Sequence, residues 1–169
     1  NVKDKNEHTP LHIAAEKNNI DIVKYLVEQC HADVNVKYGY NERTPLHIAT
    51  KKYNIDIVKY LVEQCHADNS VIDINGQTPI HIAADKSNIE IVKYLVEQGN
   101  ADVDVKDKNG QTPLHIAAEK CNIEIIKYLI EQCNADVNII DKNEQTVLQI
   151  ATDKCNSDII NYLIEKCPA

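Results

Sequence analysis

A six-residue string recurs along the chain with a nearly constant period, and this repetition restricts the fold more than any other feature of the sequence. The string TPLHIA begins at Thr9 and Thr44, returns as TPIHIA at Thr78 and as TPLHIA at Thr112, and ends as TVLQIA at Thr146. The steps are 35, 34, 34 and 34 residues. A second string, IDIVKYLVEQ and its variants, follows each copy with the same period. Such a period predicts an array of stacked supersecondary units.

Each unit predicts two short helices joined by a tight turn. In unit one, Thr9 is a good helix N-cap, and Pro10 suits the first helical position, where a missing N–H costs nothing. Asn18–Asn19 then ends the first helix and caps the second. The apolar stripe of the second helix consists of Ile22, Val23, Leu26 and Val27. The polar segment that follows is too short for a third helix and predicts an extended, hairpin-like connection.

A helix pair of this size buries only one side of its apolar surface, so neighbouring units must stack to complete a core. Because Phe, Trp and Met are absent, that core must consist of Ile, Leu, Val and Ala, with Tyr as the only large ring. We therefore predict a single all-α domain over residues 1–169, a solenoid of helix-turn-helix units with projecting hairpin loops. Its five repeats span approximately 1–35, 36–69, 70–104, 105–138 and 139–169.

The string TPLHIAA, the helix-turn-helix pattern and the closing ADVN resemble the ankyrin repeat, and the resemblance covers essentially the whole chain. It implies L-shaped units that stack into a curved solenoid, with a concave face made by the hairpins and the first helices. Members of that family use this face to recognise proteins and have no catalytic residues of their own. The resemblance therefore implies a protein-binding module without enzyme activity, and we expect no cofactor and no metal site.

Two departures from the ankyrin pattern affect the helix ends. The familiar unit has about 33 residues, whereas here one residue is added at the end of helix two, and a pair replaces the usual single glycine. These pairs are Cys30–His31, Cys65–His66, Gly99–Asn100 and Cys133–Asn134. We expect each pair to supply a left-handed residue, a conformation that Gly or Asn adopts more readily than His. The glycine that usually ends helix one is replaced by Asn18, Tyr53, Ser87, Cys121 and Cys155.

Six cysteines raise the question of disulfides or a metal site. Cys30, Cys65, Cys133 and Cys167 share one slot of the repeat, and Cys121 and Cys155 share another. Equivalent thiols in adjacent units would lie about 8–10 Å apart, whereas the Cα atoms of a disulfide are about 4.4–6.8 Å apart. We therefore expect reduced, structural cysteines in a cytoplasmic protein. The adjacent Cys-His pairs also lack the usual spacing of zinc ligands.

Histidines occupy one motif position in four units: His12, His47, His81 and His115. No Ser or Cys nucleophile recurs beside them, which argues against a general-base array. The family resemblance implies instead that each ring hydrogen-bonds to the backbone of adjoining hairpins, with Gln149 in this role in the fifth unit. The hairpin residues Asn35 and Asn138 resemble asparagines that are hydroxylated in ankyrin proteins, and ordinary turn-forming asparagine is the alternative reading.

The tyrosines divide into a periodic set and an irregular one. The periodic set on helix two, predicted to pack its rings and extend its hydroxyls to water, is Tyr25, Tyr60, Tyr94, Tyr128 and Tyr162. The three others all belong to unit two, whose hairpin is one residue longer than the rest, and they lie near the only arginine. Because Tyr and Arg are favoured at interface hot spots, we predict a partner-binding site here. Its residues are Tyr38, Tyr40, Arg43, Lys51, Lys52 and Tyr53. The alternative is that one degenerate unit has drifted.

Charge and hydropathy narrow the class of partner. A formal charge of -8 argues against nucleic acid or an anionic membrane surface, and no stretch approaches the roughly 20 apolar residues of a membrane span. The expected partner is another protein, and the chain itself is expected to be monomeric.

A spacer array that positions another domain is the alternative function, and a thiol- or zinc-dependent activity is a remote one. The abundance of Asn, Lys, Ile and Asp also suggests an AT-biased genome, which would suit an effector in a host cytosol.

Overall fold

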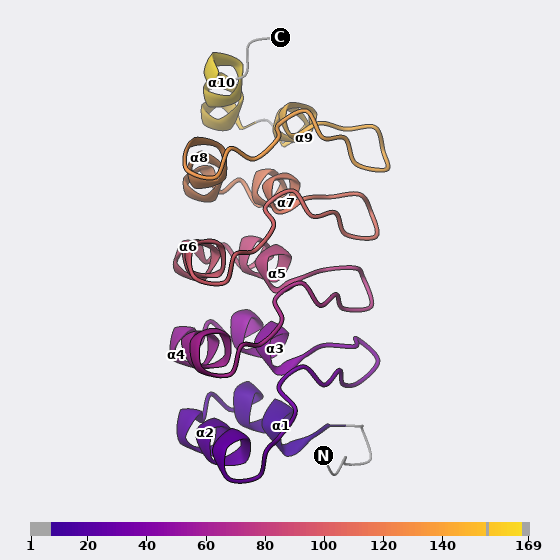
Figure 1. Cartoon of the computed structure of the whole chain (residues 1–169). Coiled ribbons are helices and arrows are strands. Elements are labelled where there is room, and N and C mark those ends of the chain that lie inside the picture. The colour runs from indigo at the N-terminus through magenta and orange to yellow at the C-terminus, as the bar shows by residue number, and fades with distance from the viewer. Residues whose placement is uncertain (1–7, 155, 167–169) are drawn as a thin grey trace.

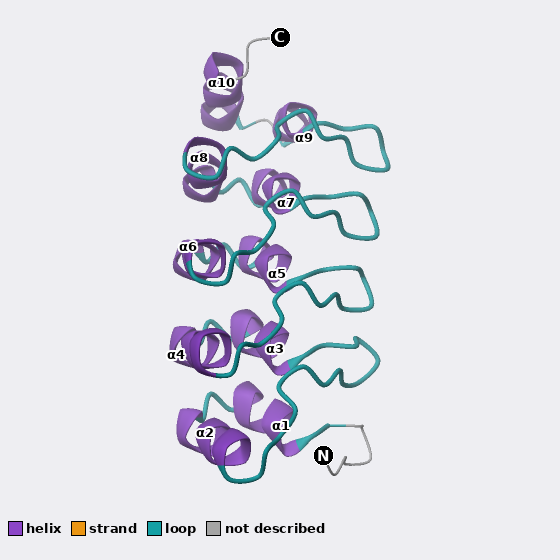
Figure 2. Cartoon of the chain, viewed as in Figure 1, coloured by secondary structure: helices purple, strands orange, loops and turns teal. Residues whose placement is uncertain are grey.

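A computed structural model describes residues 8–154 and 156–166, which form one continuous stack of five helix pairs (Figure 1). The first helices are α1 (Pro10–Glu16), α3 (Pro45–Lys51), α5 (Pro79–Asp85), α7 (Pro113–Glu119) and α9 (Val147–Asp153). The second helices are α2 (Ile20–Glu28), α4 (Ile55–Lys59) with the π-helix η1 (Tyr60–Gln64), α6 (Ile89–Glu97), α8 (Ile123–Glu131) and α10 (Ser157–Lys166). The described residues form no strand, and the hairpins all project to one side of the stack (Figure 2). The predicted all-α solenoid is confirmed.

The first helices begin as the sequence predicts, with a threonine N-cap in each and Pro at the first helical position in four of them. In α3 the backbone N–H of Thr44 donates to Nδ1 of His47 at 3.2 Å, and the Thr44 hydroxyl accepts from the backbone N–H of His47. In α9 a glutamine takes the place of the histidine, and Oε1 of Gln149 accepts from the Thr146 N–H at 2.7 Å. The histidine of the motif is therefore part of a reciprocal helix cap.

Both helices of a repeat end at a residue with left-handed backbone. The residues that end the first helices are Asn18, Tyr53, Ser87 and Cys121, with φ of 55°, 60°, 54° and 55°. Those that follow the second helices are His31, His66, Asn100 and Asn134, with φ of 49°, 49°, 54° and 53°. The left-handed residue is thus the second member of each inserted pair, even where it is histidine. The remaining predicted position, Cys155, lies outside the described residues.

In repeats two and three the inserted residue is accommodated by a wider turn at the end of the second helix. In repeat two the N–H of Cys65 donates to the carbonyl of Tyr60 at 3.2 Å, five residues back, and the last turn is the π-helix η1. In repeat three the N–H of Gly99 makes the equivalent bond to Tyr94 at 3.3 Å. A π-type turn absorbs one extra residue without a break in the helix, so the repeats keep their stacking.

The core runs along the stack between the first and second helices. Its largest fully buried side chains are Leu11, Leu46, Ile57, Leu61, Ile80, Ile91, Leu95, Leu114, Ile125, Ile126, Leu129 and Ile159. One member of the stripe predicted for α2 departs from this pattern, because Ile22 is 48% exposed while Val23 is fully buried. The equivalent of Ile22 in repeat two, Ile57, is buried. No described helix covers the corresponding side of α2, which explains the difference.

The tyrosines of the second helices connect each repeat to the one before it. Their hydroxyls donate to glutamates of the preceding repeat: Tyr60 to Glu28 at 3.1 Å, Tyr94 to Glu63 at 2.5 Å, Tyr128 to Glu97 at 3.1 Å and Tyr162 to Glu131 at 3.0 Å. A lysine nitrogen of that preceding repeat lies 5.4 to 5.8 Å from each ring centroid, a cation–π distance. These hydroxyls, which we expected at the solvent-exposed surface, bind carboxylates there, because the stacking places a glutamate within reach of each.

Candidate functional site

The hairpin that opens repeat two differs from the others at its turn. In the later hairpins a buried aspartate holds the turn, and in the first of these Oδ1 of Asp73 accepts the backbone N–H groups of Asn75 and Gln77 at 2.8 and 3.1 Å. Tyr38 takes the place of this aspartate, and its backbone pairs with Arg43 through two hydrogen bonds of 2.9 and 3.1 Å. The loop between them is one residue longer, as the sequence indicates.

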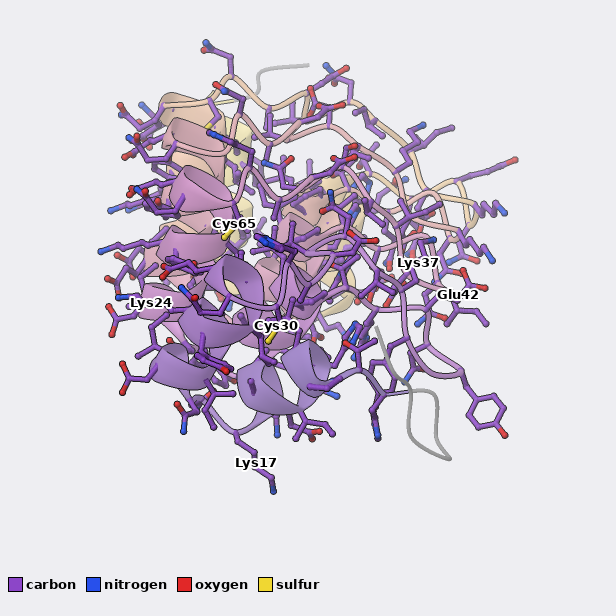
Figure 3. All side chains as sticks on the ribbon, turned by 60° about the horizontal axis from the view of Figure 1, so that its bottom comes forward. Lys17, Lys24, Cys30, Lys37, Glu42 and Cys65 are labelled. Carbon is purple, nitrogen blue, oxygen red and sulfur yellow. The ribbon has the colours of Figure 1, made fainter. Side chains whose placement is uncertain are left out.

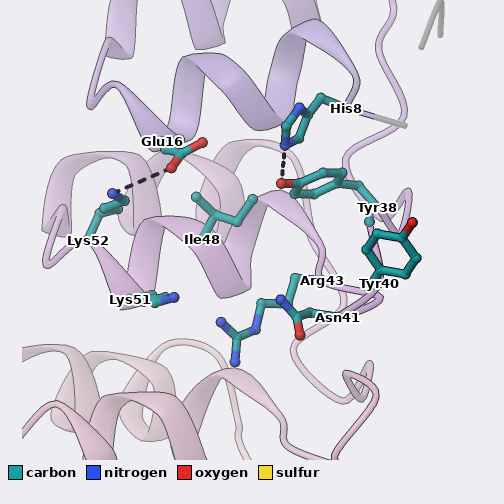
Figure 4. Close-up of a pocket in the computed structure, with 10 residues that line it drawn as sticks. His8, Glu16, Tyr38, Tyr40, Asn41, Arg43, Ile48, Lys51 and Lys52 are labelled. Atoms are coloured by element: carbon teal, nitrogen blue, oxygen red, sulfur yellow. Dashed lines mark hydrogen bonds and ion pairs between the residues drawn. The ribbon is translucent and has the colours of Figure 1, made fainter. Parts of the chain in front are cut away.

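The two tyrosines of this hairpin lie in opposite environments. The Tyr38 ring packs against His12 and His8, with centroids 4.7 and 4.0 Å away, and its hydroxyl is hydrogen-bonded to Nε2 of His8. Tyr40 is 97% exposed and projects away from the stack (Figure 4). Folding therefore accounts for the position of Tyr38, whereas burial contributes almost nothing to holding Tyr40.

Arg43 is bound within the protein. Its Nε and Nη2 atoms each donate to Oδ2 of Asp73 at 3.1 Å. The Asp73 carboxylate is fully buried, and the Arg43 side chain is 16% exposed. The pair joins the hairpin of repeat two to the hairpin of repeat three. The Arg43 guanidinium is therefore less available to a partner than the sequence suggests.

The two lysines that end α3 have different environments. Lys52 forms an ion pair with Glu16 of the preceding repeat at 3.6 Å. No carboxylate of the described residues lies within ion-pair distance of Lys51, which leaves its ammonium group without an opposite charge in contact. Partial burial, followed by the positive charges of Arg43, Lys86 and Lys52, lowers the pKa of Lys51, and the more distant Glu16 carboxylate offsets only part of this effect.

A pocket of about 360 Å³ brings most of the predicted residues together (Figure 4). Its lining includes Tyr38, Tyr40, Arg43, Lys51 and Lys52. Tyr53 is not among the lining residues and lies, 54% exposed, at the left-handed end of α3. The lining also includes His8, Glu16 and Ile48, which the sequence analysis missed. Glu16 and Ile48 follow the repeat pattern, so only their position relative to the hairpin could have revealed them.

Comparison with known proteins agrees with the architecture. The family described as ankyrin repeats (3 copies) matches the chain in overlapping segments, at residues 1–73, 29–107, 53–141 and 100–169. The chain belongs to the ankyrin-repeat family. Ankyrin repeats are generally protein–protein interaction modules. Alpha-latrotoxin-Lh1a from Latrodectus hasselti is 50% identical over 36 residues, which cover 21% of this chain and only 3% of the toxin's length.

Three of the four motif histidines have the structural role that the ankyrin resemblance implied. Nε2 of His47 lies 3.0 Å from the carbonyl oxygen of Gln77, and Nε2 of His81 lies 3.1 Å from that of Gln111, each in the next hairpin. Likewise, Nε2 of His12 lies 3.0 and 3.1 Å from the carbonyl oxygens of Val36 and Arg43, in the hairpin that opens repeat two. Burial lowers the pKa of His47 to about 4, and it lowers the pKa of His81 as well. The rings of His47 and His81 are therefore neutral caps and hairpin braces at pH 7, whereas the buried Nε2 of His115 has no hydrogen-bond partner among the described residues.

The described cysteines are free thiols. They are Cys30, Cys65, Cys121 and Cys133, and the first two lie at the ends of α2 and η1, beside the helices rather than among the hairpin residues Lys37 and Glu42 (Figure 3). Burial raises the pKa of the Cys65 and Cys133 thiols, which favours the protonated, less reactive form. Cys155 and Cys167 lie outside the described residues.

Within the described ranges, no three His, Cys, Asp or Glu side chains gather in a metal-binding arrangement. No described helix is long and apolar enough to cross a membrane.

Proposed function

We propose that this ankyrin array binds a protein or peptide partner on its hairpin face, which is the surface made by the hairpins and the first helices. The pocket of repeat two is the main contact site on that face. The observation that carries the proposal is the 97% exposure of Tyr40 at the rim of that pocket. Tyrosine is favoured at interface hot spots because it supplies a large contact area at low entropic cost. An aromatic ring placed almost entirely in solvent beside a pocket is explained by a partner better than by folding.

The opposite face of the stack is less suited to selective recognition. There the second helices present the same lysine, tyrosine and glutamate contacts in each successive pair of repeats. A surface that repeats itself offers several equivalent positions to a partner and fixes none of them. The pocket residues of repeat two occur in only one place, so they can define both a position and an orientation.

Two exposed tyrosines on opposite faces allow a direct test. A photo-reactive phenylalanine analogue is introduced at position 40 or at position 25, because Tyr25 is 61% exposed on α2 and serves as the matched control. We expect crosslinking of a discrete partner from position 40 and none from position 25. Crosslinking from position 25 alone, or from neither position, would contradict the proposal, and the second result is the one that a spacer array predicts.

The partner identified by crosslinking then permits a quantitative test. Tyr40→Ala should weaken its affinity by about tenfold or more, as expected for truncation of an interface hot spot. Tyr25→Ala should leave the affinity unchanged. Equal affinities for the wild type and both variants would show that the crosslink reported proximity rather than binding through the pocket.

A further inference from the structure

The last position of each first helix is acidic in four repeats and basic in repeat two. The acidic residues are Glu16, Asp85, Glu119 and Asp153, and Lys51 takes the equivalent position in α3. The next residue is lysine throughout: Lys17, Lys52, Lys86, Lys120 and Lys154. These two positions pair at two of the interfaces between repeats, where Lys52 lies 3.6 Å from Glu16 and Lys120 lies 2.8 Å from Asp85. We call this recurring acid–lysine pairing at the ends of the first helices the acid-to-lysine ladder; it joins repeat one to repeat two and repeat three to repeat four.

Lys51 interrupts this ladder. By the same pattern Lys86 of repeat three would pair with an acid at position 51, but it finds another lysine there and pairs with its own neighbour Asp85 at 3.0 Å. The charges of Arg43, Lys86 and Lys52 all disfavour the protonated form of Lys51. Repeat two therefore lacks one carboxylate that the architecture of the other repeats supplies.

A second contact within the repeat is changed in the same sense. In repeats four and five a glutamine before the N-cap threonine donates to the acid that ends the first helix, from Gln111 to Glu119 at 2.5 Å and from Gln145 to Asp153 at 2.6 Å. In repeat two the corresponding residues are Arg43 and Lys51. Both members of the contact are cationic, and both line the pocket.

Only one of the three cations that line the pocket lacks an opposite charge in contact. Arg43 is bound by Asp73 and Lys52 by Glu16, while Lys51 has no ion pair with any described residue. The rim also carries the Lys37–Glu42 pair, 3.4 Å apart, which is close to neutral as a unit. The pocket thus presents one unneutralised positive charge, in a lining that also includes Ile48, Tyr38 and Tyr40 (Figure 4).

We propose that Lys51 binds a carboxylate of the partner, supplied by an aspartate or glutamate in an acidic peptide segment whose neighbouring apolar side chain enters the pocket over Ile48. This inference rests on the proposed function and specifies the chemistry of the partner. The bound carboxylate takes the place of the helix-end acid that the other four repeats provide for themselves. The pocket volume of about 360 Å³ suits one or two side chains.

A peptide fits these charges better than a nucleic acid does. Phosphate backbones are bound by several cations at once, whereas this pocket offers a single unpaired lysine in a chain of formal charge -8. Glu16 also lies close enough to Lys51 to act on its charge, and it would repel an extended polyanion. A short segment that places one or two carboxylates against Lys51 avoids that repulsion.

The test uses a phage-displayed library of random 12-residue peptides selected on the whole 169-residue chain. We expect the selected peptides to share an aspartate or glutamate, and their synthetic, fluorescently labelled forms to bind at least about tenfold more weakly when that residue becomes Asn or Gln. Lys51→Glu should weaken binding by a similar factor. This substitution is compatible with the fold, because Glu119 occupies the same position in α7.

The matched control is the exchange variant Lys51→Glu/Glu119→Lys, which moves the lysine to repeat four and keeps the formal charge of the chain. It should bind the acidic peptides as weakly as the single variant does, because repeat four lacks the tyrosine-bearing hairpin. Full affinity of the exchange variant, or selected peptides without acidic residues, would overturn the assignment of Lys51.

The two proposals fail in different ways. Peptides that lose affinity with Tyr40→Ala but bind Lys51→Glu normally would overturn the role of Lys51 and leave the hairpin face as the binding surface. Peptides that are insensitive to both substitutions, or a library that yields no specific peptide, would count against both the hairpin face and the carboxylate site.

Discussion

The buried ring of His47 makes the free energy of unfolding depend on pH in mildly acidic solution. The side chain is fully buried, with Nε2 3.0 Å from the Gln77 carbonyl oxygen and Nδ1 accepting the Thr44 N–H. Burial holds the pKa at about 4, below the ordinary value of 6.5. Between these two values the unfolded chain binds a proton that the folded protein does not. Stability from His47 is therefore complete above pH 6.5 and declines as the pH falls toward 4.

The size of this effect follows from proton linkage. A pKa of about 4 in the folded state and 6.5 in the unfolded state gives a loss of about 2 kcal/mol between about pH 7.5 and about pH 5. Burial lowers the pKa values of His81 and His115 as well, so these side chains add to the loss in the same direction. With the urea m-value of about 1–3 kcal/mol/M that is usual for small proteins, His47 alone moves the unfolding midpoint by about 1 M.

The variant His47→Gln isolates this contribution. Gln149 shows that glutamine can accept the N-cap N–H at this position, with Thr146 at 2.7 Å, so the substitution keeps the cap and removes the titrating group. In urea denaturation at both pH values, the wild type should lose about 2 kcal/mol more than the variant on acidification. Equal losses in the two proteins would refute the reasoning, because the His47 ring would then not be held neutral by burial.

Three further substitutions test packing, backbone strain and the Arg43 ion pair by urea denaturation at neutral pH. Leu114→Ala should cost about 2–5 kcal/mol, because Leu114 is fully buried, and a loss below about 1 kcal/mol would contradict its place in the core. Tyr53→Gly should raise the free energy of unfolding by about 1 kcal/mol, since φ of 60° disfavours any residue with a Cβ atom; a decrease would show that packing of the ring outweighs the strain. Arg43→Gln should change it by less than about 1 kcal/mol, because Asp107 occupies the same slot as Asp73 and is buried with no arginine bound to it. A larger loss would mean that Arg43 is essential to repeat two.

The fold was predictable because its determinants are local and repeated. A Thr-Pro pair, such as Thr44–Pro45, begins the first helix in four repeats. The step of about 34 residues then leaves one way to bury the apolar faces of these short helix pairs. Even the inserted residue at the helix end was predictable in position. Its form as a π-turn was not, because the choice between a π-turn and a break depends on packing against the neighbouring repeat.

The candidate site was predictable only in outline. The irregular residues of repeat two stand out from the period, but their partners come from other repeats. The sequence does not reveal that Arg43 is held by Asp73, since Asp107 looks the same in sequence and has no such partner. The missing carboxylate opposite Lys86 becomes visible only when the stacking distance places position 51 beside it.

The distribution of irregularities within repeat two bears on the choice between drift and binding. Core positions of this repeat, such as Leu46, Ile57 and Leu61, are fully buried and follow the common pattern. Tyr38 replaces the turn aspartate, and Lys51 replaces the acidic residue that ends the first helix. The other repeats show that the fold accommodates an acidic residue at both positions. Drift would place such changes wherever stability tolerates them, on either face of the stack. Tyr38 and Lys51 both line the pocket, although Tyr53 does not, and such a concentration is what selection for a bound partner predicts. Affinity that is lost with Lys51→Glu but kept with changes on the helix-two face would distinguish binding from drift.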